Sequence, residues 1–306
     1  MENEILKSLT KFRLLLVAGG TAAVITATTA GAAPLVGVSG PSTLIGFDSA
    51  APSMVTSTLA VTGLSNEQIG GIDFRPSTGQ LYALGSAGGL YTINTATGAA
   101  TAVGSGVPVS QRDRDFGIAF NPVPDAIRIV TATDLNLRVN PTAGTTTTDT
   151  PLAYAAGDVN AGTNPTVAGV AYTNQLPGPQ TTTILYGIDV STGSLVLQSP
   201  PNSGTLSTIG SLGSAFARLG QGTTVGFDIE GGTNLAFASF FNAGSANGLY
   251  SINLTTGAAT LLGGLVPGGV SDIAVGSLVA VPEPGTLGLL AVGLFGLAAA
   301  RRRHAG

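Results

Sequence analysis

Three aspartates recur at similar places along the chain and could meet in space. Asp73, Asp228 and Asp272 each stand in the opening phrase of a repeated segment. Carboxylates that converge without histidine suit Ca²⁺, which takes roughly six to eight oxygen ligands, and two carboxyls at a defined separation can hydrolyse a glycosidic bond. Alternatively, each aspartate caps a turn or accepts backbone N–H bonds between structural units. We favour this structural role over calcium, and calcium over catalysis, because no segment has the dense acidic pattern of a calcium loop.

A second polar group lies on a predicted hairpin in the first half of the chain. Because strand side chains alternate between two faces, Arg128, Asn136 and Arg138 share one face of this hairpin. Two arginines on one face need counter-ions, and the candidates are Asp113, Asp115 and Asp125. The group is either a polar patch for an acidic sugar or another anion, or a salt-bridge network between repeat units. We favour the network.

The composition excludes several kinds of chemistry. The chain has no cysteine, and its single histidine, His304, lies close to the C-terminus. Disulfides, thiol catalysis, imidazole zinc sites and Ser-His-Asp catalysis are therefore unavailable to residues 33–281. That segment has six arginines, no lysine and thirteen acidic residues, a net charge of −7. An acidic surface argues against a nucleic-acid partner, whose binding needs basic residues.

A repeat must position these candidate residues. The opening phrase occurs at residues 71–74, 117–120, 169–172 and 226–229, and a fifth variant lies at 270–273. Each phrase is followed by a further strand pattern and by a hairpin with a Thr/Ser-x-Gly turn, most clearly at residues 90–101 and 249–260. Three or four short strands in a repeat of roughly 40–55 residues are typical of a β-propeller blade.

The two ends of this repeat region complement each other. The fifth phrase comes so late that its outer strands are missing, whereas the residues before Gly71 provide apolar stretches without an opening phrase. Joining them completes one blade, with the C-terminal strand innermost and the N-terminal strands outside, and leaves no exposed central edge. We therefore predict an all-β fold, a β-propeller with five blades, or six if the long third repeat contains another.

The N-terminus has the pattern of a secretory signal peptide. Lys7, Lys11 and Arg13 precede an apolar stretch at residues 14–27, and small residues follow at 28–33. Ala30-Gly31-Ala32 predicts cleavage by signal peptidase before Ala33. The expected domains are thus a helical signal peptide at 1–32, the propeller at 33–281 and a C-terminal tag at 282–306.

The C-terminal tag combines a short motif, an apolar run and a basic cluster: Pro282, Glu283 and Pro284, then residues 285–300, then Arg301, Arg302 and Arg303. As a transmembrane helix, the 16-residue run would span about 24 Å, against the ~30 Å core of a bilayer. Such a helix holds a protein at the membrane only briefly. The arginines would stay cytoplasmic and leave the rest outside.

This arrangement resembles the PEP-CTERM signal of Gram-negative bacteria that make exopolysaccharide. The resemblance implies recognition by an exosortase, which removes the tag near Pro282–Pro284 and releases or transfers the protein to the cell surface. The alternative is an ordinary tail anchor or single-pass stalk.

A second resemblance covers most of residues 44 to 265. Residues 116–125 and 136–141, with the phrases at 81–84 and 94–98, are similar to an uncharacterised bacterial family, domain of unknown function 4394. The resemblance implies a secreted repeat-β protein that often has such a tag. Because the family has no established activity, it assigns no catalytic residue.

Together these features predict an exported protein that is transiently anchored in the inner membrane and then becomes a cell-surface or extracellular protein. We expect a structural or glycan-binding role in the exopolysaccharide or envelope, without catalysis. The alternative is a calcium-dependent propeller hydrolase or lactonase that uses the three aspartates.

Overall fold

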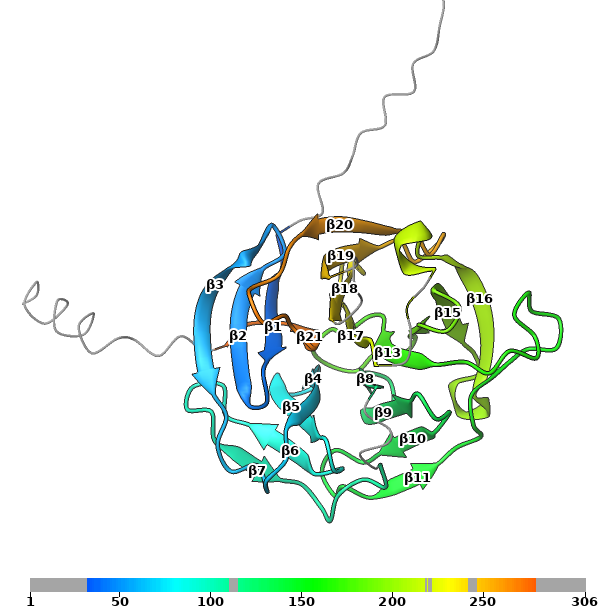
Figure 1. Cartoon of the computed structure of the whole chain (residues 1–306). Coiled ribbons are helices and arrows are strands. Elements are labelled where there is room, and N and C mark those ends of the chain that lie inside the picture. The colour runs from blue at the N-terminus through cyan, green and yellow to red at the C-terminus, as the bar shows by residue number, and fades with distance from the viewer. Residues whose placement is uncertain (1–31, 110–114, 218, 220–221, 242–246, 279–306) are drawn as a thin grey trace, which may run out of the picture.

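The computed structural model describes residues 32–109, 115–217, 219, 222–241 and 247–278. These residues form an all-β propeller of five sheets arranged around a central axis (Figure 1). The helices expected in the signal peptide and in the C-terminal tag lie outside the described residues. Within the described part, no helix is long and apolar enough to span a bilayer.

Each sheet is one blade, and its strands follow one another from the axis outward. Blade one consists of β4 (Ile69–Arg75), β5 (Gln80–Gly85), β6 (Leu90–Ile93) and β7 (Ala100–Ala102). Blade two consists of β8 (Phe116–Asn121), β9 (Ala126–Thr131), β10 (Asn136–Val139) and β11 (Thr146–Thr148). Blade three consists of β13 (Val167–Tyr172), β14 (Leu185–Asp189), β15 (Ser194–Gln198), β16 (Thr205–Ser211) and the short β12 (Ala153–Tyr154).

Blade four consists, in the same order, of β17 (Thr224–Ile229), β18 (Ala236–Phe241), β19 (Gly248–Ile252) and β20 (Ala259–Gly263). Blade five consists of β21 (Asp272–Val275), β1 (Pro34–Ser39), β2 (Thr43–Asp48) and β3 (Ala51–Ala60). Two short 3₁₀ helices, η3 (Pro201–Ser203) and η4 (Ser214–Phe216), lie in connections. The length of the third repeat comes from the long connections between β13 and β14 and between β16 and β17, and the described residues contain no sixth sheet.

The two ends of the described chain close the ring. Strand β21 pairs antiparallel with β1, in a register that places Ala274 opposite Val36. The amide of Gly276 extends this pairing by donating to the carbonyl oxygen of Pro34 at 2.9 Å. The predicted closure, with the C-terminal strand innermost and N-terminal strands outside, is therefore confirmed (Figure 1).

The recurring glycine of the opening phrase is explained by close packing at the axis. A Cβ added at Gly117 would lie 2.6 Å from the backbone nitrogen of Val170, and one at Gly226 would lie 2.5 Å from that of Ile273. No side chain fits at such distances, so glycine lets neighbouring inner strands approach each other. The repeat that reveals the fold in the sequence is thus a packing requirement of the ring.

The predicted hairpins close with the expected turn chemistry. In the turn between β6 and β7, the Asn94 side chain accepts N–H bonds from Ala96 and Thr97, and Gly98 has φ = +76°. The turn between β19 and β20 repeats this geometry with Asn253 and Gly257. Asparagine fixes the turn and glycine supplies the left-handed residue.

The core lies in apolar layers between and within blades. Three tyrosines at recurring positions are buried: Tyr82, Tyr91 and Tyr250 are 4, 2 and 7% exposed. Tyr82 of blade one meets Phe120 of blade two edge to face, with ring centroids 5.1 Å apart. These tyrosines pack within the protein, so they are not available to stack on sugars.

Candidate functional site

The structure corrects the alignment of the three aspartates. Phe74 of β4 and Val275 of β21 both pair with the leucine at the second position of the next strand of their blades. This register makes Asp73 equivalent to Ala274, and places Asp272 at the level of a glycine in the other inner strands. The alignment based on sequence alone was therefore wrong by two residues for Asp272. It failed because Asp272, the first residue of β21, occupies the position at which the other inner strands have the glycine of the opening phrase.

Asp73 and Asp228 are equivalent and make the same contact. The Asp73 carboxylate accepts the backbone N–H of Phe120 in the next blade at 2.6 Å. The Asp228 carboxylate accepts the N–H of Val275 in its next blade at 2.6 Å, and that of Ile229 at 2.7 Å. Each carboxylate therefore ties its inner strand to the following one.

Asp272 makes a related contact from its own level. Its carboxylate accepts the backbone N–H of Ile72 at 2.6 Å, which joins blade five to blade one. Three of the five inner-strand interfaces thus contain an aspartate whose side chain replaces a missing backbone acceptor. Such bonds satisfy amides that would otherwise be buried without partners.

These carboxyls have strongly perturbed ionisation. Burial raises the pKa of Asp228 to about 7, against the opposing effect of the N–H bonds from Val275 and Ile229. Burial, and then repulsion by the Asp228 charge, hold the pKa of Asp73 well above its usual range. Burial likewise raises the pKa of Asp272. Desolvation and like charge both favour the neutral acid.

A cavity of about 320 Å³ lies where the inner strands end. Its lining includes Asp73, Asp228, Phe74, Arg75 and Gln175. Asp272 does not line it, so the structure brings two of the three predicted aspartates together there and leaves the third deeper. Phe74, Arg75 and Gln175 were not predicted, because nothing in their sequence context distinguishes them from ordinary residues at a strand end.

Metal binding stays a prediction at this site. In the part of the chain that the structure describes, no three or more side chains of the acidic, histidine or cysteine type gather where they could hold a metal ion. The carboxylates of Asp73, Asp228 and Asp272 already accept backbone N–H bonds.

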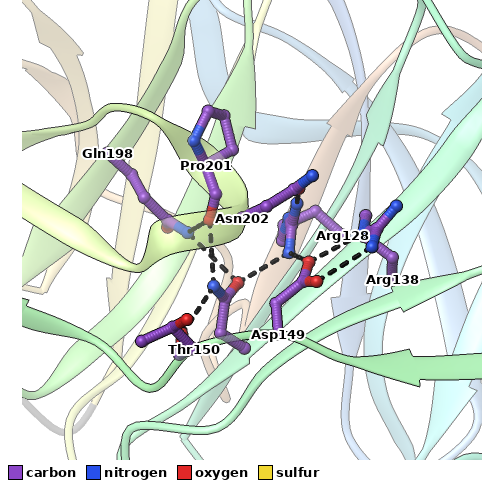
Figure 2. A network of polar contacts seen from close by, with 8 residues as sticks. Arg128, Arg138, Asp149, Thr150, Gln198, Pro201 and Asn202 are labelled. Carbon is purple, nitrogen blue, oxygen red and sulfur yellow. Dashed lines mark hydrogen bonds and ion pairs between the residues drawn. The ribbon is translucent and has the colours of Figure 1, made fainter.

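The predicted arginine group forms a buried network at the side of blade two (Figure 2). Arg128 is 2% exposed, and its guanidinium donates to Asp149 and to Asn136, both at 2.7 Å. Arg138 donates to both oxygens of Asp149, at 2.7 and 2.9 Å. The Asp149 carboxylate therefore binds two guanidinium groups, one of them in a bidentate arrangement, which is among the stronger polar contacts in proteins.

The same network joins blade two to blade three. Arg128 donates to the side chain of Asn202 at 2.6 Å, and Asn136 donates to the carbonyl oxygen of Pro201 at 2.9 Å. Gln198 donates to Asn136 at 3.1 Å and to Pro201 at 2.8 Å. As Figure 2 shows, the residues of blade two meet the turn that contains η3. These residues are thus mostly buried in contacts between blades, as in the salt-bridge network that the sequence favoured over an anion patch.

Two of the three counter-ions predicted for these arginines, Asp115 and Asp125, have other partners. Asp149 supplies the charge from just beyond β11, where no pattern in the sequence signals a partner for Arg128. Asp125 pairs instead with Arg75 at 2.5 Å, and Asp115 accepts the backbone N–H of Gly222 at 2.8 Å. Asp113 lies outside the described residues. Burial raises the pKa of Asp149, but the bonds from Arg138 and Arg128 outweigh this and hold that pKa below the usual value.

Comparison with family models decides the relationship. Residues 43–274 match the family described as Domain of unknown function (DUF4394). The chain belongs to this family. In this DUF4394 protein, residues 280–303 also match the PEP-CTERM protein-sorting motif, which contains all six sorting residues predicted from the sequence. The motif begins beyond Leu278, the last residue that the structure describes.

The sorting motif determines where the DUF4394 domain goes. A PEP-CTERM signal marks a protein that is exported, held by a membrane-anchored C-terminal tag and sorted to the cell surface by an exosortase. The mature protein is therefore an extracellular propeller.

Solved structures resemble the DUF4394 domain only distantly. One is the Myxococcus xanthus glutaminyl cyclase, with 13% identity, a TM-score of 0.42 and coverage of 65% of this chain and 77% of that one. Another is a protein of unknown function from Bacteroides thetaiotaomicron, with 14% identity, a TM-score of 0.46 and coverage of 76% and 58%. A third is the nidogen/laminin complex, with 10% identity, a TM-score of 0.46 and coverage of 82% and 100%. No curated protein matches the chain.

Proposed function

We propose that the mature domain is a non-catalytic structural or glycan-binding component of the exopolysaccharide matrix or envelope. The observation that supports this role is that the candidate catalytic and anion-binding side chains hold blades together. Asp73, Asp228 and Asp272 accept backbone amides of the next blade, and Arg128 is buried against Asp149. Residues used in this way stabilise a rigid scaffold.

The chemistry of the chain agrees with this proposal. Acyl transfer by a nucleophile and a base needs partners such as cysteine or histidine, and residues 33–281 contain neither. The sorting signal delivers the domain to the surface, where secreted polysaccharide surrounds it. After processing by signal peptidase and exosortase, the remaining acidic domain has many threonine and serine hydroxyls that can bind sugar hydroxyls through hydrogen bonds.

A binding experiment tests the role. Tag-free domain, residues 33–281, is immobilised and exposed to exopolysaccharide purified from the producing strain, with heat-unfolded domain as the control. The proposal expects retention of polysaccharide by the folded domain only, and an altered surface or matrix in a deletion strain. Absence of both effects would reject it.

A second candidate follows from the cavity at the ends of the inner strands. Asp73 and Asp228 both line this cavity, and a pair of carboxyls is the group that glycoside hydrolases use. A calcium-dependent hydrolase or lactonase would therefore place its chemistry there. Thermal unfolding after EDTA, and then with added Ca²⁺, tests it, because an ion that binds the native state raises the unfolding temperature. A Ca²⁺-specific rise that disappears when all three aspartates are replaced by asparagine would favour a calcium ion held by these aspartates, which this candidate requires.

A further inference from the structure

Both ends of the exported domain lie on the same face of the propeller. We call this the exit face; it is the face at which β4, β8, β13, β17 and β21 end. Here Gly276 donates to Pro34, and the amide of Ala33 donates to Ser49 Oγ at 2.9 Å. Leu278 is only 8% exposed and belongs to the apolar cluster between blades five and one. The chain is therefore packed into the core of the domain as far as Leu278.

The connection from this point to the membrane tag is short. Six residues, 279–284, separate Leu278 from the apolar run that begins at Gly285. Even fully extended, they reach at most ~22 Å, at about 3.6 Å per residue. A strand of six residues is itself about 20 Å long, and a domain of this size is about 45 Å across, from the scaling of its radius of gyration. The opposite face therefore cannot turn toward the bilayer while the tag is inserted.

The exit face also carries exposed apolar side chains in its turns and at the start of an outer strand. Val123, after β8, is 43% exposed, and Leu176, after β13, is 39% exposed. Met54, near the start of β3, is 67% exposed. The Arg75–Asp125 pair on the same face is neutral as a unit. This surface therefore suits the interface of a bilayer through apolar contact, and not through attraction to anionic lipid.

We propose that, until the exosortase cuts the tag, the exit face lies against the membrane that holds the tag, and the opposite face points outward. The cavity lined by Asp73 and Asp228 opens on the exit face. It therefore faces the bilayer in the tagged protein and becomes accessible to the extracellular matrix when the tag is removed. Cleavage then changes which surface of the propeller the matrix meets.

The absence of cysteine allows a direct test of orientation. Ala50 lies in the turn between β2 and β3 on the exit face, and Ala87 lies in the turn between β5 and β6 on the opposite face; both are exposed. Ala50→Cys and Ala87→Cys are therefore a matched pair. The tag-bearing protein, made in a host without exosortase, is labelled at this cysteine with a fluorophore and reconstituted in phosphatidylcholine vesicles that contain lipid with a spin-labelled headgroup.

The spin label should quench the fluorophore at position 50 several-fold more than the one at position 87. Inserting about twenty Gly/Ser residues between Leu278 and Pro282 should remove most of the difference, because the tether then permits every orientation. High salt should leave the difference unchanged. Equal quenching at the two positions, or stronger quenching at position 87, would overturn the proposal. Circular dichroism of each labelled protein checks that it is folded.

Discussion

Replacing Asp228 with asparagine should change how the stability of the domain depends on pH. In the folded state, burial raises the pKa of this carboxyl from 3.8 to about 7. The folded protein therefore retains a proton that the unfolded chain releases between these pH values. Stability from this group is full below pH 3.8, falls as the pH rises toward 7, and is constant above that.

The expected size follows from the same two values. A difference of about 3 pKa units corresponds to roughly 4 kcal/mol at ~1.4 kcal/mol per unit. For a domain of this size, each kcal/mol changes the unfolding temperature by about 2–4 °C, so the full effect is roughly 8–16 °C. Loss of the Asp228 charge also relieves the repulsion that raises the pKa of Asp73, which adds to the effect in the same direction.

Thermal unfolding of the tag-free domain between about pH 4 and pH 8 measures this effect. The unfolding temperature of Asp228→Asn minus that of the wild type should increase steadily with pH and level off above about pH 7. Asp158→Asn is the matched control, because burial raises the pKa of Asp158 but the N–H bonds of Thr208 and Asn160 outweigh it and lower that pKa. Its difference from the wild type should stay nearly constant over this range, because a lowered pKa changes stability only as the pH falls below about 3.8. A pH-independent difference for Asp228→Asn would refute the reasoning.

Other substitutions test the contacts between and within blades. Asp149→Asn should lower the free energy of unfolding in urea by about 3–5 kcal/mol, since it leaves the buried Arg128 without a counter-charge. Arg138→Ala, at a side chain 41% exposed, should lower it by about 1 kcal/mol or less. Equal losses of stability in the two variants would argue against the network. Tyr154→Phe should cost about 1–2 kcal/mol, because its hydroxyl donates to buried Asp189; an unchanged unfolding midpoint would contradict that bond. Gly117→Ala should sharply lower the yield of folded protein, and normal stability would show that the inner strands can separate.

The architecture could be predicted from the sequence because its signals are local and repeated. The geometry of one blade appears in the sequence as the glycine of each opening phrase and as the turns that begin at Asn94 and Asn253 and end in a glycine. An incomplete repeat at each end of the chain belongs to the same pattern. Counting the strands of the two incomplete repeats then indicated that the ends of the chain close the ring. Five blades were therefore predictable before the pairing of β21 with β1 was seen.

The candidate site was less predictable because its contacts connect residues far apart in the sequence. Nothing local indicates that Asp149, and not Asp125, faces Arg128, since that choice depends on how β11 leads toward blade three. The position of Asp272 was also misjudged, because a strand of four residues offers too few landmarks to fix its register. Alternation of side chains did correctly place Arg128 and Arg138 opposite each other.

Amide hydrogen exchange of the tag-free domain tests the central claim most directly, namely that aspartate bonds and the paired termini hold a closed ring. The amides of Ile72, Phe120 and Val275, which donate to aspartates of neighbouring blades, should exchange only through global unfolding. The amides of β21 should be as protected as those of β8. Rapid exchange in β21 while β8 stays protected would contradict the closed ring.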